Sequence, residues 1–290
     1  NRFQRAGTDT RKAVTTAGEH EFTLHYVEDT AADNDESSYF RPNSRPLCDA
    51  TKILIHTRDR QRPMGVIERV SQSRLVLSGV GAFGVASFVG MFALTEPIMY
   101  GANTPVNYIS YWHIALAWTS GVALLVTFGA SIQYLRTRTR YWNLVAHGSG
   151  EVGFVFLTGT LVMGSIWASE MWGTYWSWAD VRLVTLFVTW LVYLGYLLVF
   201  QSTRGTEDRY AAVYGAVGFV TIPVSYLSTR LWNPTFHAPT IGGSTGETIL
   251  DPVTLLFAIA AAMLLFGVLA SLRIRVHHAR DTLVRMGEGR

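Results

Sequence analysis

The sequence predicts an all-α integral membrane protein with six transmembrane helices and both termini on the cytoplasmic side. Three observations lead to this fold class. The 290 residues are 49% hydrophobic and 16% charged, with a mean hydropathy of +0.21, which is more typical of membrane proteins than of soluble domains. Six apolar stretches of membrane-spanning length follow one another after Arg74. Arginines are concentrated in alternate connections between these stretches, as they are in membrane proteins of fixed orientation.

Residues 1–63 form a segment of a different kind from the rest of the chain. They carry ten acidic and ten basic residues, out of 21 and 24 in the whole chain, and turn-forming clusters such as "DTAADNDESS". Such a segment buries too little apolar surface to offset the entropy of ordering it. We predict a disordered or non-native extension without assigned function over residues 1–63. We predict a six-helix membrane domain over residues 64–290, in which Met64 opens a short cytoplasmic lead into the first span.

Each apolar stretch after this extension is expected to form one helix. Because the bilayer core offers no water to unpaired peptide groups, a spanning segment must satisfy these groups within itself. The first stretch comes too late in the chain to be a secretory signal peptide, so it counts as a span. Pro223 is expected to kink the fifth helix. The expected spans are 75–94, 114–135, 144–167, 183–200, 210–227 and 253–272.

The distribution of arginine predicts which connections face the cytoplasm. The connections after the second and fourth spans and the tail after the sixth are rich in arginine, whereas the other connections hold only Arg182 and Arg230. By the positive-inside rule, the arginine-rich segments are cytoplasmic. The connections after the third and fifth spans then lie outside, and we expect a multi-pass protein of the plasma membrane. The arginines of the three rich segments are Arg136, Arg138, Arg140, Arg204, Arg209, Arg273, Arg275, Arg280, Arg285 and Arg290.

Missing motifs exclude several classes of function. Cys48 is the only cysteine, so the chain has no intramolecular disulfide, zinc cluster or covalent heme-attachment motif. It contains no phosphate-binding loop and no dinucleotide fingerprint, so any energy source must come from a partner. Lysine occurs only at Lys12 and Lys52, and no nucleic-acid partner is expected. We predict binding and handover of a ligand rather than an enzyme activity.

An aromatic segment, "MWGTYWSWAD", follows the third span at residues 171–180. Tryptophan and tyrosine are enriched at membrane interfaces, so an interfacial belt is one interpretation. A belt, however, needs aromatic residues scattered around the perimeter, and here they are concentrated beside a glycine and an acid. Such a cluster favours the binding of a large, flat, apolar ligand. Its aromatic members are Trp172, Tyr175, Trp176 and Trp178.

Two histidines on the predicted outer face narrow the choice of ligand. His113 lies at the outer mouth of the second span, and His237 lies in the outer connection after the fifth. Either histidine alone is more often an interfacial residue than a ligand. Together with the tryptophans they favour a porphyrin, which needs flat apolar cover and one or two axial ligands, commonly histidine.

The stretch "GSIWASEMWGTYWSWADVRL" resembles the tryptophan-rich signature of the heme-handling proteins of cytochrome c biogenesis, and six spans match their CcmC-type branch. The resemblance runs from about residue 64 to the C-terminus and includes "ISYWHIALAW", "LWN" and "STGETILDP". It implies that Trp172, Trp176 and Trp178 form a platform for non-covalently bound heme b, with His113 as one axial ligand. It also implies delivery of heme to a periplasmic chaperone of the CcmE type. The expected partners are ABC transporter subunits of the CcmA and CcmB types and a small CcmD-type membrane subunit.

The sequence departs from the family pattern at two positions. Ala179 precedes the aspartate in "WSWAD", where the family usually has W-x-W-D, so either the loop is one residue longer or Asp180 has moved. Tyr226 stands where the second axial histidine of the family is expected. Three alternatives follow, namely ligation by Tyr226, replacement by His237, or a single protein ligand. Asp180 and Arg182 are expected either to hold the loop or to contact heme propionates, for which a guanidinium is the better match.

A second class of function, a b-type heme subunit for electron transfer in the membrane, would hold heme between histidines inside the helices. The inner half of the spans offers only His147, one helical turn from Glu151, and a structural pairing of these two residues is at least as good an interpretation. His277 and His278 lie in the arginine-rich tail, where contact with anionic headgroups is favoured over metal binding. A third class, conduction of heme through the six helices, lacks an evident polar path.

Overall fold

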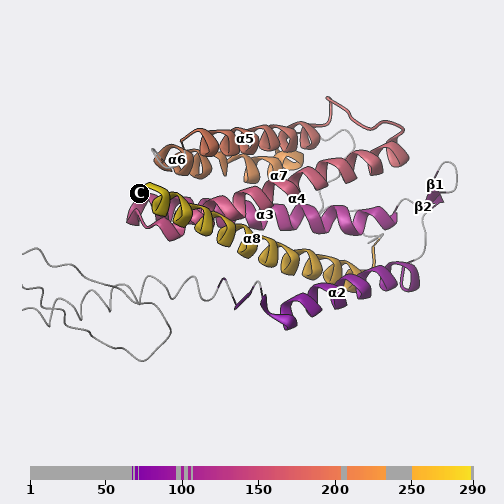
Figure 1. The fold of residues 1–290 in the computed structure, drawn as a ribbon. Coiled ribbons are helices and arrows are strands. Elements are labelled where there is room, and N and C mark those ends of the chain that lie inside the picture. The colour runs from indigo at the N-terminus through magenta and orange to yellow at the C-terminus, as the bar shows by residue number, and fades with distance from the viewer. Residues whose placement is uncertain are drawn as a thin grey trace, which may run out of the picture. The chain divides into compact units, whose positions relative to one another are not determined.

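The structure is a computed structural model that describes residues 67, 69–70, 72–95, 99–100, 104–105, 107–203, 208–232 and 250–288. The predicted extension over residues 1–63 and the candidate ligand His237 lie outside these residues. The elements in chain order are α2 (Arg74–Ala93), β1 (Met99–Tyr100), β2 (Thr104–Pro105), α3 (Asn107–Thr137), α4 (Arg140–Trp172), α5 (Val181–Thr203), α6 (Asp208–Gly218), α7 (Thr221–Leu231) and α8 (Pro252–Glu288) (Figure 1). The short antiparallel hairpin of β1 and β2 is an addition that the sequence did not predict.

Six helical segments among the described residues are long and apolar enough to cross a membrane, which confirms the predicted fold class. The helices extend beyond the predicted apolar stretches, since α3 has 31 residues and α4 has 33. Helix α8 has 37 residues and continues through the arginine-rich tail. Because roughly 20 helical residues cross the hydrocarbon core, the additional turns reach into the interfaces. The cytoplasmic placement of the termini stays a prediction.

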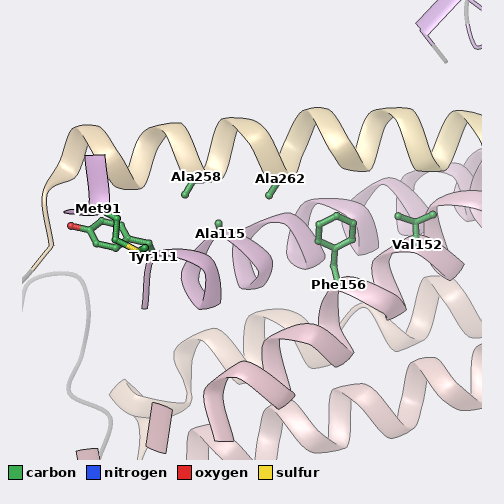
Figure 2. Close-up of a cluster of buried hydrophobic side chains, with 7 residues drawn as sticks. All are labelled: Met91, Tyr111, Ala115, Val152, Phe156, Ala258 and Ala262. Atoms are coloured by element: carbon green, nitrogen blue, oxygen red, sulfur yellow. The ribbon is translucent and has the colours of Figure 1, made fainter. Parts of the chain in front are cut away.

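The two larger hydrophobic clusters among the described residues each join four helices. The first joins α2, α3, α4 and α8, and the alanines of α3 and α8 let these helices approach closely (Figure 2). The second joins α3, α4, α5 and α6. In Figure 1, α2 lies beside α8, and α5 lies beside α6 and α7. The first cluster contains Met91, Tyr111, Ala115, Val152, Phe156, Ala258 and Ala262. The second contains Leu124, Leu157, Tyr193, Tyr196, Phe200 and Ala211.

The fifth predicted span consists of two helices, α6 and α7, separated at Phe219 and Val220. Pro223 lies in the first turn of α7, where its ring has no N–H to donate to the carbonyl of Phe219. The backbone N–H of Ile222 instead donates to the carbonyl of Phe219 at 3.0 Å, and that of Val220 donates to Val217 at 3.2 Å. These tighter bonds replace the regular helical pattern. The predicted kink is therefore present, as a break just before the proline.

Charged side chains join three helices at the start of α4, which is the opposite end of that helix from the tryptophan-rich segment. Arg140 pairs with Asp208 of α6, and with Asp281 of α8 at 2.5 Å. Asn143 donates a further hydrogen bond to Asp208 at 2.8 Å. Because all of these side chains are partly or largely buried, their mutual contacts offset the cost of removing charge from water.

His147 and Glu151 both have partners on other helices. The Nδ1 atom of His147 lies 2.9 Å from the hydroxyl of Tyr196. Glu151 accepts a hydrogen bond from Arg273 at 2.6 Å and lies 3.1 Å from Nε2 of His277. These contacts connect α4 to α5 and α8. They also correct one expectation, because His277 is only 4% exposed and faces a carboxylate rather than lipid headgroups.

Candidate functional site

The tryptophan-rich connection between α4 and α5 begins at Gly173, which ends α4. Gly173 has a φ of 69°, in the left-handed region that glycine adopts without strain, and its N–H donates to the carbonyl of Ser169 at 3.1 Å. Thr174 then forms a local turn with Trp176. The Thr174 hydroxyl donates to the Trp176 carbonyl at 2.9 Å and accepts from its backbone N–H at 3.4 Å. The first half of the connection is therefore shaped by its own hydrogen bonds.

Asp180 ends the connection and caps α5. Its carboxylate accepts hydrogen bonds from the backbone N–H groups of Arg182 and Leu183, both at 3.1 Å, and the residue is fully buried. These are two of the N–H groups that would otherwise be unpaired at a helix start. Ala179 is exposed in the preceding turn, which the Asp180 N–H closes by bonding to the Ser177 carbonyl at 3.3 Å. Ala179 thus lies in a surface turn, and Asp180 occupies the capping position of α5.

A first aromatic group, made of His113, Trp167 and Trp172, connects α3 to the end of α4. Trp167 contacts both of the other rings, with centroid separations of 6.0 Å to His113 and 5.7 Å to Trp172. The ring plane of Trp167 is tilted by 33° from that of His113 and by 55° from that of Trp172. The centroid separations are within the range of favourable aromatic contacts. Through Trp167, the structure brings His113 to the edge of the tryptophan-rich connection.

A second aromatic group contains Trp176, Trp178, Phe187 and Trp190. Trp176 and Trp178 meet edge to face with centroids 5.4 Å apart, and both contact Phe187 at 5.7 Å and 6.0 Å. Phe187 stacks on Trp190, whose indole N–H donates to Thr158 of α4 at 2.9 Å. The group is therefore anchored to the bundle, while Trp178 at its edge is 70% exposed.

Each aromatic group contains a buried indole N–H that finds no acceptor among the described residues. The Nε1 atoms of Trp167 and Trp176 have no hydrogen-bond partner in the part of the chain that the structure describes. Most buried polar groups in proteins are paired, so such donors call for an explanation. Both nitrogen atoms are covered by the protein, so a ligand at the surface of these rings does not reach them.

His113 lies in the second turn of α3, half-buried against α4. Its Nδ1 atom is 3.1 Å from the backbone carbonyl of Thr160. Because a carbonyl only accepts, this hydrogen bond requires the hydrogen on Nδ1, and in the neutral imidazole Nε2 then carries the lone pair. This is the tautomer in which a histidine coordinates a metal through Nε2.

Tyr226 of α7 lies near Arg182 at the start of α5. The side chains of Tyr226 and Asp180 both lie within electrostatic range of the Arg182 guanidinium, and a hydrogen bond between Thr185 and Ser225 at 3.3 Å joins the same two helices. Tyr226 is 42% exposed. Three of the predicted site residues, Asp180, Arg182 and Tyr226, therefore lie together at the capped end of α5.

Sequence reasoning missed three residues that surround His113, namely Thr160, Gly164 and Trp167. All three lie on α4, and their relation to His113 depends on how α3 and α4 are aligned. A sequence alone does not give that alignment. Two of them, Gly164 and Trp167, lie within the quoted tryptophan-rich stretch, which begins at Gly164.

Comparison with known proteins finds matches over most of the chain. Residues 48–237 match the family described as cytochrome C assembly protein. A heme exporter protein C from Bradyrhizobium diazoefficiens is 31% identical over 64% of this chain and 72% of its own length. A putative cytochrome c biosynthesis ccmC-like mitochondrial protein from Marchantia polymorpha is 29% identical over 60% of this chain and 74% of its own length. A heme exporter protein C from Paracoccus denitrificans is 27% identical over 73% of this chain and 88% of its own length.

Proposed function

This chain belongs to the cytochrome c assembly protein family, and on that premise we propose that it binds heme and passes it on during cytochrome c biogenesis. The relatives confirm the CcmC-type resemblance found in the tryptophan-rich stretch. In the proposal, heme lies against the tryptophan-rich connection with His113 as an axial ligand to iron. One observation carries it, namely that Trp167 contacts both His113 and Trp172. This contact links a candidate iron ligand to the aromatic connection.

The residues present match the chemistry of a heme. Flat aromatic faces cover a porphyrin, and the two aromatic groups supply such faces on either side of the turn at Gly173. Arg182 adds a positive charge in the same region, and a guanidinium matches a carboxylate in geometry. The heme is held without a covalent bond, as heme b.

The second axial position has two candidates in the proposal, Tyr226 and His237. Tyr226 lies beside Arg182 and is 42% exposed, and tyrosine is a known heme ligand. His237 belongs to the connection after the fifth span, and we favour it because histidine is the commonest axial ligand of heme. A replaceable second ligand suits a carrier, since a carrier that binds too tightly does not release its cargo.

The protein acts by binding and handover, not by making or breaking covalent bonds. The tryptophan-rich connection faces the periplasmic side of the plasma membrane, where a CcmE-type chaperone takes the heme. ABC transporter subunits of the CcmA and CcmB types supply the energy that this chain lacks, and a small CcmD-type subunit completes the assembly. Asp180 serves this function indirectly, because it fixes the start of α5 and with it the end of the connection.

A cellular experiment tests the proposed function. Cells that lack their own copy of the gene are given the parent protein, His113→Ala or the control His278→Ala. His278 lies in the exposed tail of α8, so its loss should not affect the site. We expect His113→Ala to abolish holo-cytochrome c while its amount in the membrane equals that of the parent. Normal cytochrome c levels with His113→Ala would overturn His113 as the ligand that holds the cargo.

A further inference from the structure

The imidazole of His113 packs against the backbone of α4 at Gly164. A Cβ atom at this position would lie 2.8 Å from Cε1 and 3.2 Å from Nδ1 of His113. Real Cβ atoms essentially never approach other atoms within 3.0 Å, so any larger residue at position 164 forces the imidazole to move. Gly164 is therefore required for the ring position that the structure shows.

The same position of the ring places its Nδ1–H on the carbonyl of Thr160. Thr160 and Gly164 are four residues apart, so they lie on the same face of α4, one above the other. The Thr160 carbonyl has two lone pairs, one for the regular helical bond and one for the histidine. The close approach of α3 and α4 makes this contact possible. A second glycine of α4, Gly153, also leaves room for this close approach. A Cβ at Gly153 would lie 3.0 Å from side-chain atoms of Ala123 and Leu124 on α3.

We propose that Gly164 is a positioning residue that fixes both the orientation and the tautomer of His113. The inference rests on the proposed function, because it takes His113 as the axial ligand. Histidines that bind metals usually donate their other ring N–H to a carbonyl or carboxylate, which holds the ring and makes it a stronger electron donor. Gly164 leaves the space in which the Thr160 carbonyl performs this task for His113.

The contact has a chemical consequence for the bound heme. A hydrogen bond from Nδ1–H increases the negative character of the imidazole, and this character stabilises ferric iron relative to ferrous iron. Loss of the bond should weaken hemin binding and raise the reduction potential of the bound heme. A residue that only filled space between two helices would alter protein stability without changing the potential.

The test compares Gly164→Ala with Gly159→Ala in purified full-length protein titrated with hemin. Gly159 lies on the same helix and also faces α3, but a Cβ there would meet only the flexible end of Leu116, at 3.3 Å. We expect the dissociation constant of hemin to rise about 10- to 100-fold with Gly164→Ala, the range found for loss of such supporting bonds. We also expect a higher reduction potential. Gly159→Ala should match the parent in both.

A third protein, His113→Ala, separates the two levels of the proposal. If His113→Ala loses hemin while Gly164→Ala and Gly159→Ala both match the parent, the role of Gly164 is overturned and the proposed function stands. If His113→Ala binds hemin as the parent does, the proposed axial ligand itself is wrong.

A measurement on the parent protein covers the case in which Gly164→Ala does not fold. Nitrogen-15 NMR of histidine-labelled protein without heme reports which ring nitrogen carries the proton, and a spectrum of His113→Gln identifies the His113 signals. We expect the proton on Nδ1. A proton on Nε2 would overturn the inference, since the Thr160 carbonyl would then have no donor.

Discussion

Loss of the Asp180 carboxylate should weaken heme binding through the loop rather than through charge. Asp180 is fully buried and accepts two backbone hydrogen bonds at 3.1 Å, from Arg182 and Leu183. Replacing a capping aspartate with alanine typically costs about 1 kcal/mol, within a range of roughly 0.5 to 2 kcal/mol. If this energy holds the tryptophan-rich connection in its binding shape, the same energy is lost from hemin binding. We therefore expect Asp180→Ala to raise the dissociation constant of hemin about fivefold.

Asp180→Asn is the matched control for this prediction. Asparagine caps helices about as well as aspartate does, but it carries no charge. Titration of the purified proteins with hemin, together with their thermal unfolding in detergent, should therefore place Asp180→Asn close to the parent and Asp180→Ala below it in both measurements. If Asp180→Asn loses as much affinity as Asp180→Ala while unfolding like the parent, the carboxylate acts by its charge and the capping argument is wrong.

Two further predictions concern charged side chains. Arg182→Ala should weaken the binding of hemin by about 1 kcal/mol, or roughly fivefold, because one partly exposed charged contact to a propionate is lost. Binding of hemin dimethyl ester, which has no propionate charge, should not change, and an equal loss for both ligands would contradict the assignment. Asp251 precedes α8 and lies outside the spans. Hydrogen bonding to Thr254 holds its pKa below the ordinary 3.8, and the backbone N–H of Thr254 donates to its carboxylate at 2.6 Å. A carboxyl group with a lowered pKa in the folded protein stabilises the fold at pH values above its ordinary pKa, and this stabilisation is lost as the pH falls through the lowered pKa. The melting temperatures of the parent and Asp251→Ala should therefore differ at neutral pH and begin to converge as the pH falls below about 3.8; a difference that is the same at all pH values would refute this role.

The six spans followed from the sequence because the bilayer imposes a simple requirement on length and polarity. Pro223 likewise predicted an irregular fifth span, because a proline has no backbone N–H to donate to the regular helical hydrogen bond. The break itself, at Phe219 and Val220, lies one turn before the proline. Its place reflects the missing bond to the carbonyl of Phe219.

The surroundings of His113 did not follow from the sequence. Its contacts with Thr160, Gly164 and Trp167 arise from the alignment of α3 against α4. Local patterns such as periodicity and turn residues carry no information on that alignment. The capping role of Asp180 was within reach of the sequence, because aspartate is a preferred cap before an apolar helix. Holding the loop was one of the two roles expected for Asp180, and its hydrogen bonds to the start of α5 agree with that role.

If His113 and the tryptophan-rich connection hold heme, the absorption spectrum of the protein with hemin must depend on these residues. Detergent-purified parent protein, His113→Ala, Tyr226→Phe, His237→Ala and the control His278→Ala are each mixed with hemin, freed of excess hemin, and recorded in the oxidised and reduced states. We predict a Soret band in the parent and in the control, loss of this band in His113→Ala, and a shifted band in either Tyr226→Phe or His237→Ala. If the parent shows no Soret band, or if His113→Ala shows the same band as the parent, then heme is not held by His113 as proposed.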